Sequence, residues 1–170
     1  MENKFGLDEP GKKARASDQI TADLENAELA ETLKKTSHLL NAVLDSIPDV
    51  IGVQDLNHRV IRYNKAGYDF VGKGPEEVRG RRCFELISSA SACAECATSE
   101  VYRTKQVARV VKYVPEVSKW LDVRAYPILD ENGELTKIIE HLRDITREKK
   151  AEAELQAAHE RLITILDSIE

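Results

Sequence analysis

The chain lacks any long apolar run. Its apolar stretches fall short of the roughly 18–20 residues that a helix needs to cross a bilayer, and its start has no signal-peptide h-region. Three cysteines in 170 residues are too few, and odd in number, for the disulfide framework of a small secreted protein. Eight glycines and five prolines exclude collagen-like and Pro/Gly-rich disordered chains. We therefore expect a cytoplasmic protein without a membrane span.

Neither sign of charge dominates, with 25 basic and 30 acidic residues and a net charge of −5. No basic stripe is present, so nucleic acid is not an expected partner. The apolar fraction of 42% is enough for one core with flanking segments. No nucleophile–base pair or phosphate-binding loop stands at a useful spacing, and we expect no enzymatic activity in this chain.

Helices are predicted at both ends. Residues 1–17 are polar and predict a disordered lead-in. An amphipathic helix is predicted over residues 18–47, ended by Pro48, and a linker helix over residues 147–170, with the Thr146 hydroxyl capping its first turn. Apolar residues in both helices alternate in spacings of four and three, which is typical of coiled coils. These positions are Leu29, Leu33, Thr36, Leu40, Val43 and Ile47, then Leu155, Ala158, Leu162, Ile165 and Ile169. We expect a homodimer through these helices.

The segment between the helices, residues 48–146, has the pattern of a sheet. Two β-branched runs within residues 49–64 surround a turn at residues 56–58, which predicts a hairpin. Four glycines between residues 65 and 87 then separate short helical pieces. Three more strands are predicted, over residues 107–114, 118–130 and 134–145. This order predicts a single antiparallel sheet of the α+β class.

An internal repeat links the two ends of the chain. Residues 39–49 and 161–170 share the tetrapeptide LDSI and the same placement of apolar residues. We expect a second copy of the domain to begin there, followed by further modules of the same polypeptide.

The middle of the chain, residues 38–146, resembles a PAS domain, the sensory-box module of bacterial signal-transduction proteins. The residues that carry the resemblance are YNKAGYDFVG followed by EEVRG, and the terminal Asp144-Ile145-Thr146. The resemblance implies a five-stranded antiparallel sheet in the order 2-1-5-4-3, with short helices on one face around a cavity. It implies a sensory or dimerisation module, with Asp144, Ile145 and Thr146 relaying a signal to the next helix. Family frequency favours a sensor histidine kinase of a two-component system as the parent protein.

Alternation along the last two strands predicts which side chains line that cavity. Leu121, Val123, Ala125 and Leu129 share the apolar face of one strand; Ile138, Glu140 and Leu142 share a face of the other. By similarity to flavin-binding PAS relatives, the Glu140 face points inward. A buried carboxylate must be paired, hydrogen-bonded or protonated. Glu140 is expected either to accept from backbone amides of the helical segment or to contact a ligand or metal.

The three cysteines, Cys83, Cys93 and Cys96, are spaced C-x9-C-x2-C. Thiolates at this spacing bind zinc or an iron–sulfur cluster, but such sites normally need a fourth ligand. A dithiol switch needs only two thiols, and simple packing needs none of this chemistry. All three alternatives stay open. The histidines His38, His58 and His141 have no partner at metal spacing and are expected to be ordinary exposed or half-buried residues.

Haem and flavin are not expected. Ala97 stands where covalent c-type haem attachment requires a histidine, and the helix before the third strand has no histidine to ligate haem in the manner of some PAS domains. The segment GRRCFEL resembles the photoreactive segment GRNCRFLQ of flavin-binding light sensors, with Cys83 at the reactive position. Arg82 and Ile87 replace its Asn and Gln, which would leave a polar flavin edge unsatisfied.

Two functions are therefore weighed. One is a sensory input module that detects a small ligand or a redox or metal state and relays it through the flanking helices. The alternative is a ligand-free dimerisation spacer that only transmits a signal.

Overall fold

The structure is a computed structural model that describes residues 10–89 and 91–168; for residues 10–18 and 20–22 only the backbone is described. The chain divides into two units, one up to Val43 and the other from Leu44 onward. The second unit contains the sheet, the short helices and the C-terminal helix.

The N-terminal helix α1 runs from Pro10 to Asp45. It begins before the predicted start at residue 18, so the predicted disordered lead-in was wrong over residues 10–17, while residues 1–9 lie outside the described residues. Proline is tolerated in the first helical turn because its missing N–H has no helical acceptor there. Four apolar residues of the predicted stripe, Leu29, Leu33, Leu40 and Val43, are all more than half exposed in the single chain.

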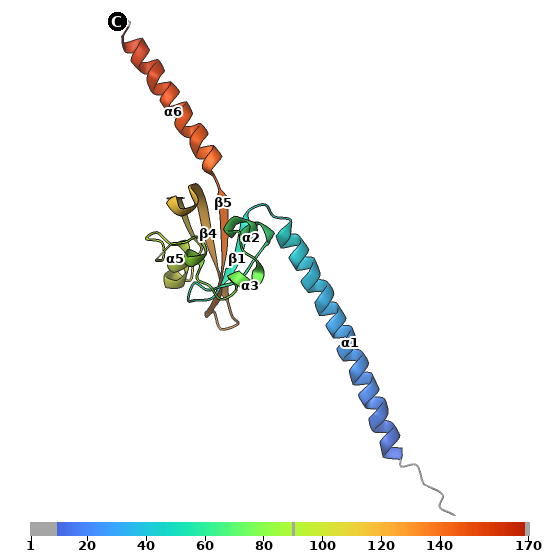
Figure 1. Ribbon diagram of the computed structural model, residues 1–170. Helices are drawn as coiled ribbons and strands as arrows, with labels where there is room; N and C mark the ends of the chain where they lie inside the picture. Colours follow the sequence, from blue (N-terminus) through green and yellow to red (C-terminus); the bar gives the residue numbers. More distant parts are fainter. Residues whose placement is uncertain (1–9, 90, 169–170) are drawn as a thin grey trace, which may run out of the picture. The chain divides into compact units, whose positions relative to one another are not determined.

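Five antiparallel strands form one sheet in the order β2-β1-β5-β4-β3 (Figure 1). The strands are β1 (Val50–Gln54), β2 (Val60–Tyr63), β3 (Ala108–Val114), β4 (Lys119–Leu129) and β5 (Leu135–Asp144). The predicted sheet, its order and its antiparallel class are confirmed. The long strands β4 and β5 pair with each other, and β5 also pairs with β1.

Four short helices and one 3₁₀ turn connect the strands. They are α2 (Lys65–Val71), α3 (Pro75–Val78), α4 (Cys83–Leu86), α5 (Ala97–Thr104) and η1 (Pro115–Val117). Each helix is too short to be stable alone, so its stability comes from packing on the sheet. Val101 of α5 packs with Leu121 and Val123 of β4. Val78 of α3 belongs to one buried cluster with Val60 of β2 and Val50 of β1.

Alternation places the inward side chains of β4 and β5 largely as predicted. Leu121, Val123, Ala125, Ile138 and Glu140 are all buried. Leu129, predicted on the same face, is instead 45% exposed. The pairing register shifts between Ile128 and Leu129, and such an irregularity breaks the two-residue alternation on which the prediction relied.

The C-terminal helix α6 runs from Thr146 to Asp167. Thr146 was predicted to cap it, but its hydroxyl accepts from Trp120 N at 2.9 Å instead. Asp144 Oδ1 accepts from Thr146 N at 3.0 Å and so takes the predicted role. Both α1 and α6 end at the Asp of an LDSI tetrapeptide, at Asp45 and Asp167. Among the described helices, none is long and apolar enough to span a membrane.

Candidate functional site

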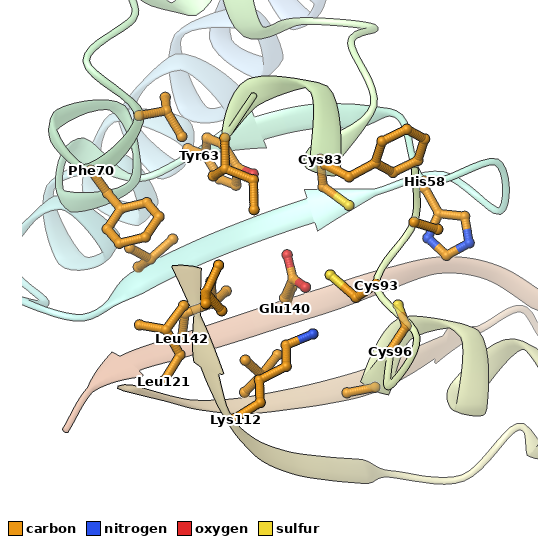
Figure 2. Close-up of a pocket in the computed structure, with 18 residues that line it drawn as sticks. His58, Tyr63, Phe70, Cys83, Cys93, Cys96, Lys112, Leu121, Glu140 and Leu142 are labelled. Carbon is orange, nitrogen blue, oxygen red and sulfur yellow. The ribbon is translucent and has the colours of Figure 1, made fainter. Parts of the chain in front are cut away.

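A cavity of about 50 Å³ lies between the sheet and the short helices (Figure 2). Most of its wall is apolar and comes from β1, β2, β4, α2 and α4. Polar and titratable groups come from different elements; these are His58, Cys83, Cys93, Cys96, Lys112 and Glu140. The cavity is therefore mostly apolar, with polar and titratable side chains gathered on one wall.

Glu140 lies at the centre of this wall. It is 8% exposed and stands on β5, paired with Gly52 of β1 and Ala125 of β4. Its carboxyl accepts from Gln54 Nε2 at 2.6 Å and from Thr98 Oγ1 at 3.4 Å. The expectation that backbone amides would bind it was wrong, because side chains from β1 and α5 reach it first. Burial raises the pKa of Glu140 to about 7, and the nearby Cys96 adds to the rise.

The remaining predicted cavity residues divide into two groups. Leu121, Val123 and Leu142 line the cavity together with Glu140. Ala125 and Ile138 are fully buried but belong to the packed core beside it. Ala125 and Ile138 pair with Glu140 and Pro127, further from the α6 end of the sheet than Leu121 and Leu142.

The three cysteines converge on the cavity from separate segments. Cys83 begins α4, Cys93 lies in the following connection, and Cys96 is the N-cap of α5. All three are free thiols and half-buried. Burial raises the pKa of Cys83 far above its ordinary value, and Glu140 adds to the rise. Cys83 thus stays protonated and packs against the apolar core.

Cys96 has the opposite electrostatic environment. Burial by itself opposes ionisation of its thiol, but the His58 imidazole and Ser99 outweigh burial and lower the pKa of Cys96 to about 6. Ser99 N donates to Cys96 Sγ at 3.5 Å, and Ser99 Oγ lies 3.5 Å from His58 Nε2. The interaction with Cys96 in turn raises the pKa of His58. The pair therefore favours a thiolate beside an imidazolium.

His58 is not the ordinary histidine that the sequence suggested. It has a φ of 61° in the turn between β1 and β2, a left-handed conformation that few non-glycine residues adopt. Its carbonyl accepts from Cys83 N at 3.0 Å, which fixes the turn to α4. Its Nδ1 is buried and makes no hydrogen bond to a described residue.

Lys112 of β3 was also not among the cavity residues predicted from the sequence. Its Nζ donates to the carbonyl of Glu95 at 2.6 Å and so holds the loop between Cys93 and Cys96. Its positive charge lies close enough to Glu140 to oppose the rise of that pKa. The strand pattern does place Lys112 on the inward face, between Val110 and Val114, and an inward lysine was the available signal.

The end of β5 is joined to both β4 and α6. Ile145 N donates to Trp120 O at 2.9 Å, and Thr146 Oγ1 donates to Asp144 Oδ1 at 2.6 Å. Lys119 of β4 forms an ion pair with Asp144. The predicted relay residues Asp144, Ile145 and Thr146 are thus one hydrogen-bonded junction.

The family model described as the PAS fold matches residues 44–150 of this chain. The chain belongs to the PAS family. No curated protein matches it.

Solved structures agree with the PAS fold. The PAS domain of BvgS from Bordetella pertussis is 21% identical, with a TM-score of 0.52 over 75% of this chain and 98% of that one. A sensory box sensor histidine kinase from Vibrio cholerae is 15% identical, with a TM-score of 0.50 over 69% and 98%. An RNA-binding light-oxygen-voltage receptor is 17% identical, with a TM-score of 0.57 over 73% of this chain but only 37% of that chain. At these identities the similarity concerns the fold.

The size and donors of the PAS cavity bear on the cofactors considered from the sequence. An engineered apolar cavity of about 150 Å³ binds benzene, so a cavity of about 50 Å³ accommodates molecules close to water in size in this conformation. Within residues 10–89 and 91–168, no three His, Cys, Asp or Glu side chains are placed to hold one metal ion.

Proposed function

We propose that this PAS domain is a sensory input module, in which a chemical change in the cavity alters β5 and is passed to α6. Membership of the PAS family supports a module that senses or transmits a signal. In this proposal the chain has no catalytic role. A sensor histidine kinase is the proposed parent, supported by the similarity to the Vibrio cholerae protein.

One observation carries the proposal: the buried Glu140 stands on the strand that leads directly into α6. From Glu140, four residues of β5 lead to Asp144, whose carboxylate binds the first residue of the helix. The same junction is tied to β4 through Trp120. A change in the charge of Glu140 therefore acts on a strand whose end sets the start of α6.

The alternative of a ligand-free spacer explains the cavity less well. A spacer needs only a packed apolar core, whereas burying a polar group without a hydrogen-bond partner costs several kcal/mol. Here Gln54 Oε1 is buried and has no hydrogen-bond partner among the described residues. A site that keeps such groups is better suited to changing its protonation or chemical state.

Replacing Glu140 with Gln is expected to change hydrogen exchange at the start of α6. At pH 8 Glu140 is mostly a carboxylate because its pKa is about 7, so Glu140→Gln mimics its neutral form. We expect exchange of amides in residues 145–155, followed by mass spectrometry, to differ about fivefold, which corresponds to roughly 1 kcal/mol. Adding Thr146→Val should reduce this difference, because it removes the hydroxyl bonds of Thr146 to Trp120 N and Asp144 Oδ1, while Asp144 Oδ1 still accepts from Thr146 N.

Glu131→Gln, in the exposed turn before β5, serves as the control for loss of one negative charge. Equal exchange in the wild type and Glu140→Gln over residues 145–155 would favour the spacer. A difference that Thr146→Val leaves at full size would show that the signal takes another route.

We also propose a homodimer through the flanking helices. The apolar stripe of α6 is exposed in the single chain, with Leu155, Leu162 and Ile165 at 73%, 61% and 56%. Heptad spacing matches that of a second, identical helix. Leu33→Glu with Leu162→Glu is expected to convert a dimer to a monomer, as measured by light scattering. Lys34→Glu, off the stripe, should leave the mass unchanged; a monomeric wild type would refute this part of the proposal.

A further inference from the structure

Of the three cavity thiols, Cys93 and Cys96 differ from Cys83 in their surroundings. Cys93 and Cys96 belong to one C-x-x-C segment and face the same small space. The Glu95 carbonyl between them is held by Lys112. Cys83, in contrast, packs into the apolar core.

We propose that Cys96 is a peroxide-reactive thiol and that Cys93 then closes a disulfide with it, so that this cavity senses hydroperoxides. This inference rests on the proposed function of the cavity as the input site.

Position favours Cys96 as the first thiol to react. As the N-cap of α5 it accepts from Ser99 N at 3.5 Å, and a helix N-terminus stabilises a thiolate. His58 approaches from the turn between β1 and β2 and adds a positive charge. Glu140 from β5 and Cys83 from α4 also interact electrostatically with this thiol.

The chemistry balances with hydrogen peroxide as the only oxidant. The Cys96 thiolate attacks one peroxide oxygen, the O–O bond breaks, and the leaving hydroxide takes a proton from the His58 imidazolium to give water. Cys96 is now a sulfenic acid. The Cys93 sulfur attacks the Cys96 sulfur, the S–O bond breaks, and hydroxide leaves with the Cys93 proton as a second water. Two thiols have lost two electrons, and one peroxide has been reduced.

The cavity suits this oxidant in size. A space of about 50 Å³ admits molecules close to water in size, and hydrogen peroxide is only one oxygen larger. A bulky aromatic hydroperoxide does not fit. Both reacting thiols are half-buried rather than fully enclosed, so a small oxidant can reach them.

Oxidation would also change the state of Glu140. Burial is the main cause of its raised pKa, and the charge on Cys96 is the next. A disulfide is neutral, so its formation removes that second contribution and favours the Glu140 carboxylate. The thiol reaction is thereby connected to β5, the strand that leads to α6.

Alkylation of the full chain tests the reactivity of Cys96 without any substitution. At pH 6 a thiol of pKa about 6 rather than 9.0 is roughly 500-fold more ionised, while its lower basicity reduces its nucleophilicity about 20-fold. Iodoacetamide labelling, followed by mass spectrometry of each cysteine, should therefore be about 20-fold faster at Cys96 than at the same residue in urea. His58→Asn tolerates the positive φ and should abolish most of this advantage. His38→Asn, on α1, is the matched control.

Peroxide treatment tests the order of reaction. In Cys93→Ser, hydrogen peroxide should leave a sulfenic acid on Cys96 that dimedone traps. In Cys96→Ser neither a trapped sulfenic acid nor a disulfide should form at the wild-type rate, while Cys83→Ser should form the Cys93–Cys96 disulfide normally. Cumene hydroperoxide should react at least about tenfold more slowly than hydrogen peroxide with the wild type, because of its size.

The proposal would be overturned if Cys93 or Cys83 were oxidised first, or if Cys96 were alkylated no faster than in urea. Stoichiometric metal on the anaerobically purified chain would also overturn it. Failure of the proposed function gives a different result. If the disulfide forms but amide hydrogen exchange over residues 145–155 is unchanged by both oxidation and Glu140→Gln, the thiol chemistry stands and the sensory role fails. If exchange follows Glu140→Gln but no oxidation occurs, only the thiol proposal is lost.

Discussion

Replacing Asn64 with Ala is expected to lower the free energy of unfolding of the PAS domain by about 3 kcal/mol. The Asn64 side chain is 1% exposed and joins three parts of the chain. Its Oδ1 accepts from Ile51 N and Gly67 N, each at 3.0 Å. Its Nδ2 donates to the carbonyls of Leu44, Ile47 and Asp49, at 3.0, 3.2 and 2.9 Å.

The size of this effect follows from what the substitution leaves behind. Alanine removes the N-cap of α2, which alone is worth about 1 kcal/mol. It also leaves the Leu44 carbonyl at the end of α1, and the Ile47 and Asp49 carbonyls before β1, without their shared donor. A buried polar group that loses its partner costs about 1–3 kcal/mol. For a domain of this size, about 3 kcal/mol corresponds to a fall in melting temperature of at least about 12 °C.

Urea denaturation and thermal melting of Asn64→Ala measure this effect directly. Asn57→Ala is the matched control, because Asn57 is exposed in the turn between β1 and β2, and its loss should cost less than about 0.5 kcal/mol. Similar stabilities for the two variants would show that the junction of α1 with β1 does not depend on the amide.

The second large effect is a pH dependence of stability caused by Glu140. Its pKa is about 7 in the folded chain, mainly because of burial, against an ordinary value of 4.5. Between these values the folded state binds more protons than the unfolded state, so stability falls as the pH rises. The contribution of neutral Glu140 is fully present below about pH 4.5 and is lost above about pH 7, by roughly 3 kcal/mol in total.

Glu140→Gln should remove this part of the pH dependence. We expect the difference in unfolding free energy between the variant and the wild type to grow in favour of the variant from pH 5 to pH 8. The neutral carboxylic acid supplies an O–H donor near Gln54 Oε1, the buried atom that otherwise lacks a partner. Glu131→Gln controls for the change in net charge. A constant difference across this range would mean that Glu140 is ionised in the folded protein throughout.

The sequence was sufficient for features that depend on local pattern. Two-residue alternation grouped Leu121 with Val123, and Glu140 with Leu142, because side chains of a strand point alternately to its two sides. The resemblance to flavin-binding PAS domains then predicted that the Glu140 face points inward. Glycines marked the boundaries between the short helical pieces. The strand order came from the resemblance to PAS domains, carried by short motifs such as Asp144-Ile145-Thr146.

Alternation failed where the chain departs from regular geometry. It placed Leu129 inward, but an irregular register exposes that side chain. It could not say that the Thr146 hydroxyl would turn to the Trp120 amide rather than to its own helix. Both outcomes depend on which backbone groups of β4 lack a partner after the strands have paired.

The chemistry of the cavity was decided by tertiary structure alone. Gln54 reaches Glu140 across 86 positions of sequence, and Lys112 reaches the Cys93–Cys96 loop across 17. His58 meets Cys96 only because the β1–β2 turn is bound to α4 and the N-terminus of α5 lies beside it. The sequence determined that a carboxyl and three thiols belong to this domain, and the resemblance to PAS domains predicted that the carboxyl faces inward. Which thiol ionises and which is inert depends on burial and on neighbours from distant segments, because desolvation and charge act through space and not along the chain.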